Sequence, residues 1–362
     1  MEKEERAATG GHVVALDGLR GIAILFVFVF HAFNANLLWM GVDIFFVLSG
    51  FLITGILLRQ KRKSFLNYLG GFYIQRSRRI LPAYSVFLAV SVLLFGTGWL
   101  SYWYLYLGGM NFLIPLNLPH LSTQPLWSLA VEEQFYLLWP LAVFFLDKRR
   151  LIILAWALLI LAPVLRWVCT PYFSSGFATY MLLPFRMDTL AAGALVALYM
   201  SGVPMQASVV QVNLRPYRVH ALLLLVAGAT LAIALNAKGL KPTMGSQLAN
   251  TALLEATLMI SVGLLLLSLM GVGVRGLSSK GLTGLGRISY SFYLIHMTAL
   301  QLAPPHGWAL ALGMTLAYSI VMWVVIERPI LRRGHRTEPK RGVPQLEPTG
   351  VNVSADERIK VL

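Results

Sequence analysis

An arginine and a histidine lie eleven residues apart in an apolar stretch near the start of the chain. Arg20 and His31 both fall within residues 16–38, which are apolar enough to be placed inside a lipid bilayer. A helix advances 100° and about 1.5 Å per residue, so the two side chains share one helix face and lie roughly 16 Å apart along it. Arg20 is therefore expected near the membrane surface and His31 near the midplane, where ionisable groups are costly and usually serve a functional site.

The histidine is suited to proton transfer. Desolvation at membrane depth disfavours a charged imidazole, so His31 is expected to be neutral and able to take a proton from a hydroxyl group. A lone histidine in a helix can also be a structural hydrogen-bonding residue, and Arg20 could be a snorkelling anchor paired with Asp17. The shared face favours a general base at His31 and an arginine that positions an anionic ligand at Arg20.

A second pair of basic residues precedes another predicted span. Arg76 and Arg79 are spaced i, i+3 just before Pro82, which is expected to open a helix. On one face they could hold a phosphate-bearing ligand at the cytoplasmic rim. The nearby cluster from Arg59 to Lys63 is more simply a topology anchor that touches anionic lipid.

Two adjacent carboxylates, Glu132 and Glu133, fall within a further predicted span. They are about 100° apart on a helix, so only one is expected to face a cavity. That carboxylate could orient His31, hold a hydroxyl group of a substrate or pair with Arg186, and purely structural pairing is the alternative. His296, at the outer end of its predicted helix, is expected to be interfacial rather than catalytic.

Four more residues are candidates for substrate binding: Asp43, Trp127, Arg186 and Asp188. The structural alternative for Asp43 is a helix cap, and for Arg186 and Asp188 it is a charge pair with each other. Aromatic residues such as Trp127 occur in membrane-interface belts but can also stack on sugars.

The elements that must position these residues are membrane helices. Hydrophobic residues make up 57% of the chain and charged residues 12%, and the mean hydropathy is +0.69. These values predict an all-α, polytopic membrane protein. The apolar stretches predict ten spans, at 18–38, 41–58, 80–97, 126–146, 150–169, 178–200, 220–236, 248–270, 285–303 and 307–327. We expect a cytoplasmic tail over 1–15, a membrane domain over 16–330 and a disordered cytoplasmic tail over 331–362.

The basic residues orient this bundle. With both termini inside, all but five of the 30 Lys and Arg residues fall on the cytoplasmic side, which the positive-inside rule requires. The net charge of +15 is then explained by topology and anionic lipid, so no nucleic-acid partner is expected. Residues 96–124 carry no Lys, Arg, Asp or Glu and are expected to form an extracytoplasmic re-entrant or interfacial segment.

Several motifs occur in a fixed order along the chain. They are LDGLRG at 16–21 with His31 beyond it, GVDIFFVLSGF at 41–51, Arg-x-x-Arg at 76–79, WSLAVEEQFYL at 127–137, FRMD at 185–188 and ISYSFYLIH at 288–296. In these motifs the chain resembles the acyltransferase-3 family of integral membrane acyltransferases, which includes O-antigen acetylases, nodulation-factor acetylases and macrolide acyltransferases. Ala130 stands where many members carry Ser.

The resemblance implies transfer of an acyl group, commonly acetyl, from acyl-coenzyme A to a carbohydrate hydroxyl at the inner (plasma) membrane. It implies a catalytic centre of His31, Arg20, Glu132 and Glu133, with coenzyme A held by Arg76 and Arg79 and with no metal. The acceptor is expected to be an envelope or exported glycan, and the alternative is a cytoplasmic glycoside such as a macrolide. A secondary transporter is the competing class, but the repeated halves with broken helices that mark transporters are not evident in the sequence.

Overall fold

The structure is a computed structural model that describes residues 13–118, 125–173, 176–201, 205–206, 209–210, 217–241 and 245–336. Its α-helices are α2 (Val14–Phe33), α3 (Gly41–Gln60), α4 (Phe65–Phe95), α5 (Leu126–Phe145), α6 (Lys148–Cys169), α7 (Gly176–Met181), α8 (Met187–Met200), α9 (Arg218–Ala237), α10 (Leu254–Leu269), α11 (Val274–Leu277), α12 (Lys280–Leu302), α13 (Trp308–Met322) and α14 (Arg328–Arg336). The predicted all-α class is confirmed.

Shorter elements join these helices. Among the described residues, 3₁₀ turns cover Leu38–Met40, Gly98–Leu107, Met110–Phe112, Thr170–Tyr172 and Leu183–Phe185. π-helical turns lie at Ala249–Leu253, before α10, and at Trp323–Glu327, between α13 and α14. Two short strands, β1 (Met205–Gln206) and β2 (Val209–Val210), pair antiparallel.

The described helices agree with a polytopic membrane protein. Within the described ranges, seven helices are long and apolar enough to cross a membrane: Val14–Phe33, Leu38–Gln60, Phe65–Phe95, Lys148–Tyr172, Arg218–Ala237, Ala249–Leu269 and Trp308–Arg332. Each of the ten predicted ranges holds helix, but the sixth is interrupted, since α7, a 3₁₀ turn and α8 share it. Ten crossings with both termini inside stay a prediction.

Two predicted boundaries differ from the structure. α4 begins at Phe65 rather than near residue 80, and Pro82 lies inside it. The first part of α4 includes the poor helix formers Gly70 and Gly71, so propensity does not explain it; packing of the buried Tyr68 and Phe72, with a hydrogen bond from Tyr68 to the carbonyl oxygen of Pro140, stabilises it instead. At the other end, α14 continues to Arg336, inside the predicted disordered tail. The rest of that tail, residues 337–362, and residues 1–12 of the predicted N-terminal tail lie outside the described residues.

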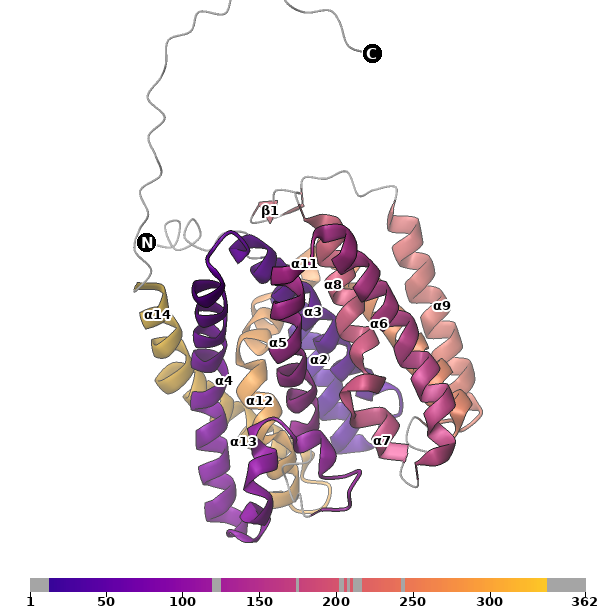
Figure 1. Cartoon of the computed structure of the whole chain (residues 1–362). Coiled ribbons are helices and arrows are strands. Elements are labelled where there is room, and N and C mark those ends of the chain that lie inside the picture. Colours follow the sequence, from indigo (N-terminus) through magenta and orange to yellow (C-terminus); the bar gives the residue numbers. More distant parts are fainter. Residues whose placement is uncertain are drawn as a thin grey trace, which may run out of the picture.

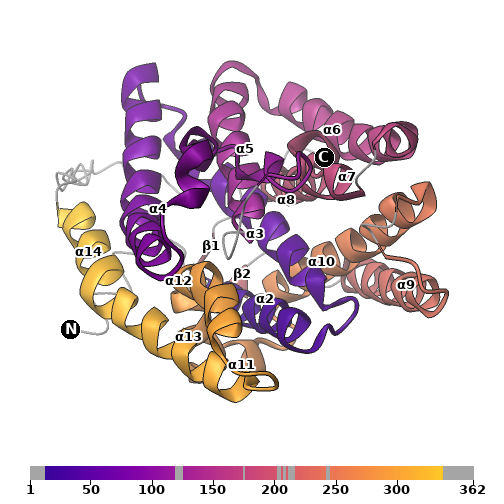
Figure 2. The same ribbon diagram turned by 90° about the horizontal axis from the view of Figure 1, so that it is seen from below.

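The helices form one bundle (Figure 1). Viewed from below, α3 lies near the middle, α4, α13 and α14 lie toward one edge, and α6 and α9 lie toward another (Figure 2). Burial agrees with this arrangement: 72% of the apolar window of α3 is buried inside the protein, against 17% for α4 and 22% for α6. The outer helices therefore expose apolar side chains to the lipid, as expected for a membrane bundle.

Glycines bring two pairs of helices into backbone contact. On α2 and α12, a Cβ added to Gly21 would meet the carbonyl oxygen of Leu282, and one added to Gly286 would meet the carbonyl oxygen of Asp17. On α3 and α8, a Cβ added to Gly50 would likewise meet the carbonyl oxygen of Leu190. Lipid offers no hydrophobic drive between helices, so this close approach of backbones is a main source of their association.

We predict that Gly286→Val destabilises the protein by about 3 kcal/mol or more, because the new side chain must push α12 away from α2. Gly284→Val is the matched control, since it places the same residue in the same helix where a Cβ would meet no described atom within 4 Å. Thermal unfolding of the purified protein in detergent measures both. Equal melting temperatures for the two variants would contradict the close contact.

Candidate active site

His31 lies in the last turn of α2, two residues before the helix ends at Phe33. Because α2 begins at Val14, Arg20 lies nearer one end of the helix and His31 lies near the other. These helix bounds favour a position of His31 toward the end of α2 rather than at the expected midplane of the membrane. The side chain is half-buried, and its Nδ1 is 2.9 Å from the carbonyl oxygen of Val27.

A second histidine lies against the first. His296 on α12 is fully buried, and its Nε2 is 3.3 Å from Nδ1 of His31. The ring centroids are 5.0 Å apart. The interfacial position predicted for His296 is wrong, because the contact between α12 and α2 covers it. The spacing of Ser289, Tyr293 and His296, four and then three residues, marks one polar helix face and is the signal that could have revealed this residue.

Three arginines gather at another part of the bundle. Arg20 of α2 interacts electrostatically with Arg76 and Arg79 of α4, and all three side chains are half-buried. The guanidinium carbon of Arg76 is 4.2 Å from the centroid of the Tyr136 ring, a cation–π contact. Arg78, which lies between Arg76 and Arg79 in sequence, is exposed. The structure thus joins two basic features that the sequence presented separately, and we call Arg20, Arg76 and Arg79 the arginine cluster.

The two adjacent glutamates face different surroundings. The Tyr136 hydroxyl donates to Oε2 of Glu132 at 3.1 Å and also bonds the hydroxyl of Ser49. Glu132 interacts electrostatically with Arg76 and Arg20 of the arginine cluster. Glu133 lies beside Gly108 and interacts with Tyr84 and Tyr290, and it also interacts electrostatically with Arg76. Both carboxylates therefore interact with the arginine cluster, Glu132 with two of its arginines and Glu133 with one.

Tyr293 connects this carboxylate with the histidine pair. Its hydroxyl is 2.7 Å from Oγ of Ser128 and donates to the carbonyl oxygen of Pro125 at 2.9 Å, and it interacts electrostatically with Glu132. Its ring centroid is 5.5 Å from that of His296. Polar side chains from α5 and α12 therefore lie between the arginine cluster and His31.

Glu327 is a buried carboxylate that the sequence analysis missed. It lies at the end of a π-helical turn, accepts a hydrogen bond from Ser291 and interacts electrostatically with Arg79. π-helical turns are frequent at functional sites. A single glutamate at the end of an apolar run, followed directly by Arg328, was the available signal, and the adjacent arginine made it look like an ordinary helix end.

The other acidic and basic candidates form a separate buried network across α3, α6, α8 and α10. Asp43 pairs with Arg186 and accepts a hydrogen bond from Thr257 at 2.5 Å. Asp188 pairs with Arg166 at 2.6 Å. The alternative of a helix cap at Asp43 is wrong, because no side chain caps α3. Arg186 and Asp188 do form structural charge pairs, but their ion-pair partners are Asp43 and Arg166, and their own contact is only electrostatic.

Trp127 lies next to this network. It is buried, with its ring centroid 5.1 Å from that of Tyr180 and 6.0 Å from that of Phe46. The guanidinium of Arg186 lies over the same two rings, 5.2 Å from Tyr180 and 5.5 Å from Phe46. The ion pairs and ring contacts join these side chains across four helices, which favours a role in bracing the helices, although the buried Nε atoms of Arg166 and Arg186 make no hydrogen bond among the described residues.

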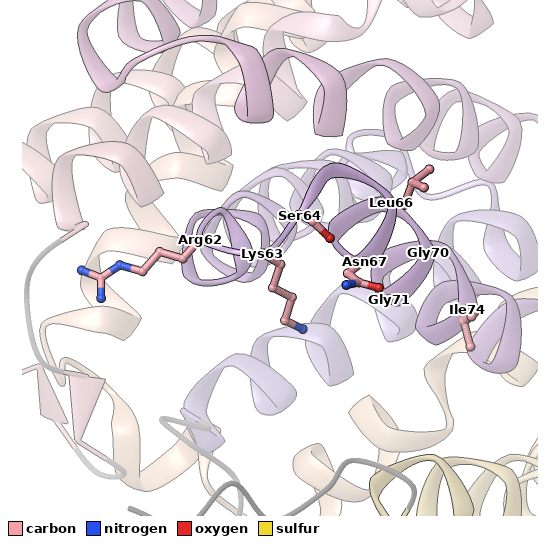
Figure 3. A pocket seen from close by; sticks show the side chains of 8 residues that line it. All are labelled: Arg62, Lys63, Ser64, Leu66, Asn67, Gly70, Gly71 and Ile74. Atoms are coloured by element: carbon pink, nitrogen blue, oxygen red, sulfur yellow. The ribbon is translucent and has the colours of Figure 1, made fainter. Parts of the chain in front are cut away.

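A pocket of about 770 Å³ opens at the start of α4. Its lining residues are Arg62, Lys63, Ser64, Leu66, Asn67, Gly70, Gly71 and Ile74 (Figure 3). Ile74 and Arg76 are two residues apart on a helix, about 200°, so this pocket lies on the face of α4 opposite the arginine cluster. Lys61, beside the pocket, donates a hydrogen bond to the carbonyl oxygen of Leu146, and this bond links the turn between α3 and α4 to the end of α5.

The structure is thus a bundle of apolar helices that holds a cluster of three arginines and a pair of contacting histidines, as a membrane protein with a polar site would. A family model described as an acyltransferase domain matches residues 13–326. The chain belongs to this acyltransferase-3 family.

Proteins similar to this chain are named as O-acetyltransferases or as candidates for that activity. The chain is 39% identical over 151 residues to the peptidoglycan O-acetyltransferase OatA of Listeria monocytogenes, an alignment that covers 36% of this chain and 24% of that protein. It is 37% identical over 149 residues to YrhL of Bacillus subtilis, named as a candidate for the same activity, with coverage of 36% and 23%. A candidate O-acetyltransferase of Staphylococcus aureus strain COL is 29% identical over 213 residues, with coverage of 51% and 34%. The chain thus spans about a third or less of the length of these relatives. No solved structure matches it.

We predict that Asp43→Asn destabilises the protein by about 3 to 5 kcal/mol, because it leaves the buried guanidinium of Arg186 without its ion-pair partner. Asp147→Asn is the control. Asp147 forms an exposed pair with Arg150 and caps α6, and asparagine caps a helix about as well as aspartate, so a loss of no more than about 1 kcal/mol is expected. Unfolding in detergent measures both, and similar losses would contradict the bracing role.

Proposed function

We propose that this protein is a membrane O-acyltransferase that moves an acyl group, commonly acetyl, from acyl-coenzyme A to a carbohydrate hydroxyl. The observation that carries the proposal is the placement of Arg20 and His31 toward opposite ends of α2, with Arg76 and Arg79 of α4 beside Arg20 and with Glu132 and Tyr293 between the arginine cluster and His31. Coenzyme A is a long molecule with phosphates at one end and the thioester at the other. A site with phosphate-binding arginines at one end and a base at the other suits such a donor.

The donor is positioned by charge. Arg76 and Arg79 lie on one face of α4 and take the phosphates through charge-assisted hydrogen bonds, with Arg20 completing the cluster. The pantetheine arm runs along α2 toward His31, a distance of roughly 16 Å between the two side chains by helix rise. Glu132 balances the charge of Arg20 and Arg76 and helps to hold their guanidinium groups in place.

The acyl transfer depends on a base. A protonated hydroxyl is a poor nucleophile, so His31 removes its proton as the oxygen attacks the thioester carbonyl carbon. The new C–O bond forms, the C–S bond breaks, and the thiolate leaves with the proton that His31 carries. No metal is required for these steps.

The acceptor is proposed to be an envelope glycan reached from the outer side. Two relatives are named for O-acetylation of peptidoglycan, which makes its glycan strands the first acceptor to test. The position of His31 at the end of α2 away from Arg20 also suits an acceptor that approaches from the side opposite the donor. In this proposal Asp43, Arg186, Asp188 and Trp127 do not contact the acceptor, and they support the site only by holding its helices together.

Replacing His31 by Ala is expected to lower the rate of acyl transfer by about 100- to 10,000-fold, the usual effect of losing a general base. The assay uses radiolabelled acetyl-coenzyme A and purified muropeptides with the protein in proteoliposomes. His220→Ala, which removes an exposed histidine near the start of α9, is the control and should retain full activity. A His31→Ala rate within a few-fold of the parent would refute the assignment.

Alanine at Arg76 or Arg79 is expected to raise the KM for acetyl-coenzyme A about tenfold or more, since a charge-assisted hydrogen bond to phosphate contributes about 1.5 to 3 kcal/mol. The KM for the acceptor should change little. Arg78→Ala is the matched control because Arg78 lies on the same turn but is exposed. An equal rise for all three variants would indicate a general effect of charge at the membrane surface and would contradict a defined donor site.

A further inference from the structure

His296 makes hydrogen bonds that the proposed chemistry has not yet used. Its Nδ1 is 2.7 Å from the carbonyl oxygen of Tyr293, and its Nε2 is 3.3 Å from Nδ1 of His31. Nδ1 of His31 is in turn 2.9 Å from the carbonyl oxygen of Val27. The two rings are therefore linked to each other, and each is also linked to the backbone of its own helix.

These contacts determine where the protons lie. A carbonyl oxygen can only accept, so Nδ1 of His296 carries a proton and donates it to Tyr293. In a neutral imidazole the other nitrogen is then an acceptor, so Nε2 of His296 accepts from Nδ1–H of His31. That proton is shared with the carbonyl oxygen of Val27. Nε2 of His31 is left with a free lone pair, the atom that a base needs.

The surroundings explain why a histidine suits this place. His296 is fully buried, and the centroids of Tyr293 and Phe30 lie 5.5 Å from His296 and 4.8 Å from His31, respectively. In many hydrolases a carboxylate orients the catalytic histidine, but here it would have to be buried as a charge in apolar surroundings, at considerable cost. A neutral imidazole accepts the same hydrogen bond without that cost.

We propose that His296 is a positioning residue that fixes the tautomer and orientation of His31, so that Nε2 of His31 faces the acceptor hydroxyl. This inference rests on the proposed function. When Nε2 of His31 takes the hydroxyl proton, the positive imidazolium keeps its Nδ1–H directed at Nε2 of His296, and a hydrogen bond to a charged donor is stronger than one to a neutral donor. His296 neither gains nor loses a proton in the step, since the proton passes from the hydroxyl to His31 and then to the leaving thiolate.

The first test compares three variants in the assay with acetyl-coenzyme A and muropeptides. His296→Ala should lower kcat about ten- to a hundredfold while the KM for acetyl-coenzyme A stays within about twofold of the parent. His296→Gln should recover most of the activity, because its side-chain oxygen reaches the position of Nε2 and can accept from His31. His296→Asn should stay as low as His296→Ala, because the shorter side chain reaches only the position of Nδ1. Parental kcat in His296→Ala, or equal activity of the Gln and Asn variants, would overturn the proposal.

The second test places His296→Ala in a His31→Ala background. A residue that acts only through His31 has nothing left to position, so the double variant should match His31→Ala. A further loss of activity in the double variant, or a matching loss of thermal stability in the single variant, would show a structural role and overturn the proposal. Full activity of His31→Ala alone is a distinguishable result, because it would refute the base itself and with it the role of His296.

Discussion

The backbone contact between α2 and α12 is the constraint on which the rest of the site depends. Gly21 and Gly286 let the two helices approach so closely that a methyl group would not fit between them. Ten residues beyond these glycines, His31 and His296 come into hydrogen-bonding contact. A small separation of the helices at the glycines would move the rings apart by a similar distance, because packed helices are rigid over three turns. Packing of small residues therefore controls the geometry of the proposed base.

The charged side chains inside the bundle gather in two groups where opposite charges meet, and the histidine pair lies apart from both groups. Each arginine of the arginine cluster interacts with a carboxylate, Asp17 for Arg20, Glu132 for Arg76 and Glu327 for Arg79. The buried network of Asp43, Arg186, Arg166 and Asp188 is likewise built from opposite charges. The histidine pair instead uses neutral rings and backbone carbonyls. Charges are thus held where partners offset their desolvation, while the proposed reacting group lies among uncharged ones.

The sequence predicts those features that depend on local periodicity. Helix period and hydropathy give the all-α class, the approximate helix ranges and the shared face of Arg20 and His31. They do not give partners that lie far apart in the chain, such as Asp43 with Arg186, separated by 143 residues, or His31 with His296, separated by 265. Those pairings depend on which helices become neighbours, and no local pattern encodes that. The start of α4 was missed for a related reason, since hydropathy marks the membrane-embedded part of a helix and not its polar extension.

The route between the two ends of the proposed site follows from the same packing. If the donor phosphates occupy the arginine cluster, the acyl group must travel along α2 to reach His31. Between them lie Tyr136, Glu132 and Tyr293, which are joined to one another by hydrogen bonds or electrostatic contact. The amide groups of a pantetheine arm need hydrogen-bond partners when they leave water, and these side chains offer hydroxyl and carboxylate groups along that line. The polar residues between the arginines and the histidine are thereby explained by the donor that the two ends are proposed to hold.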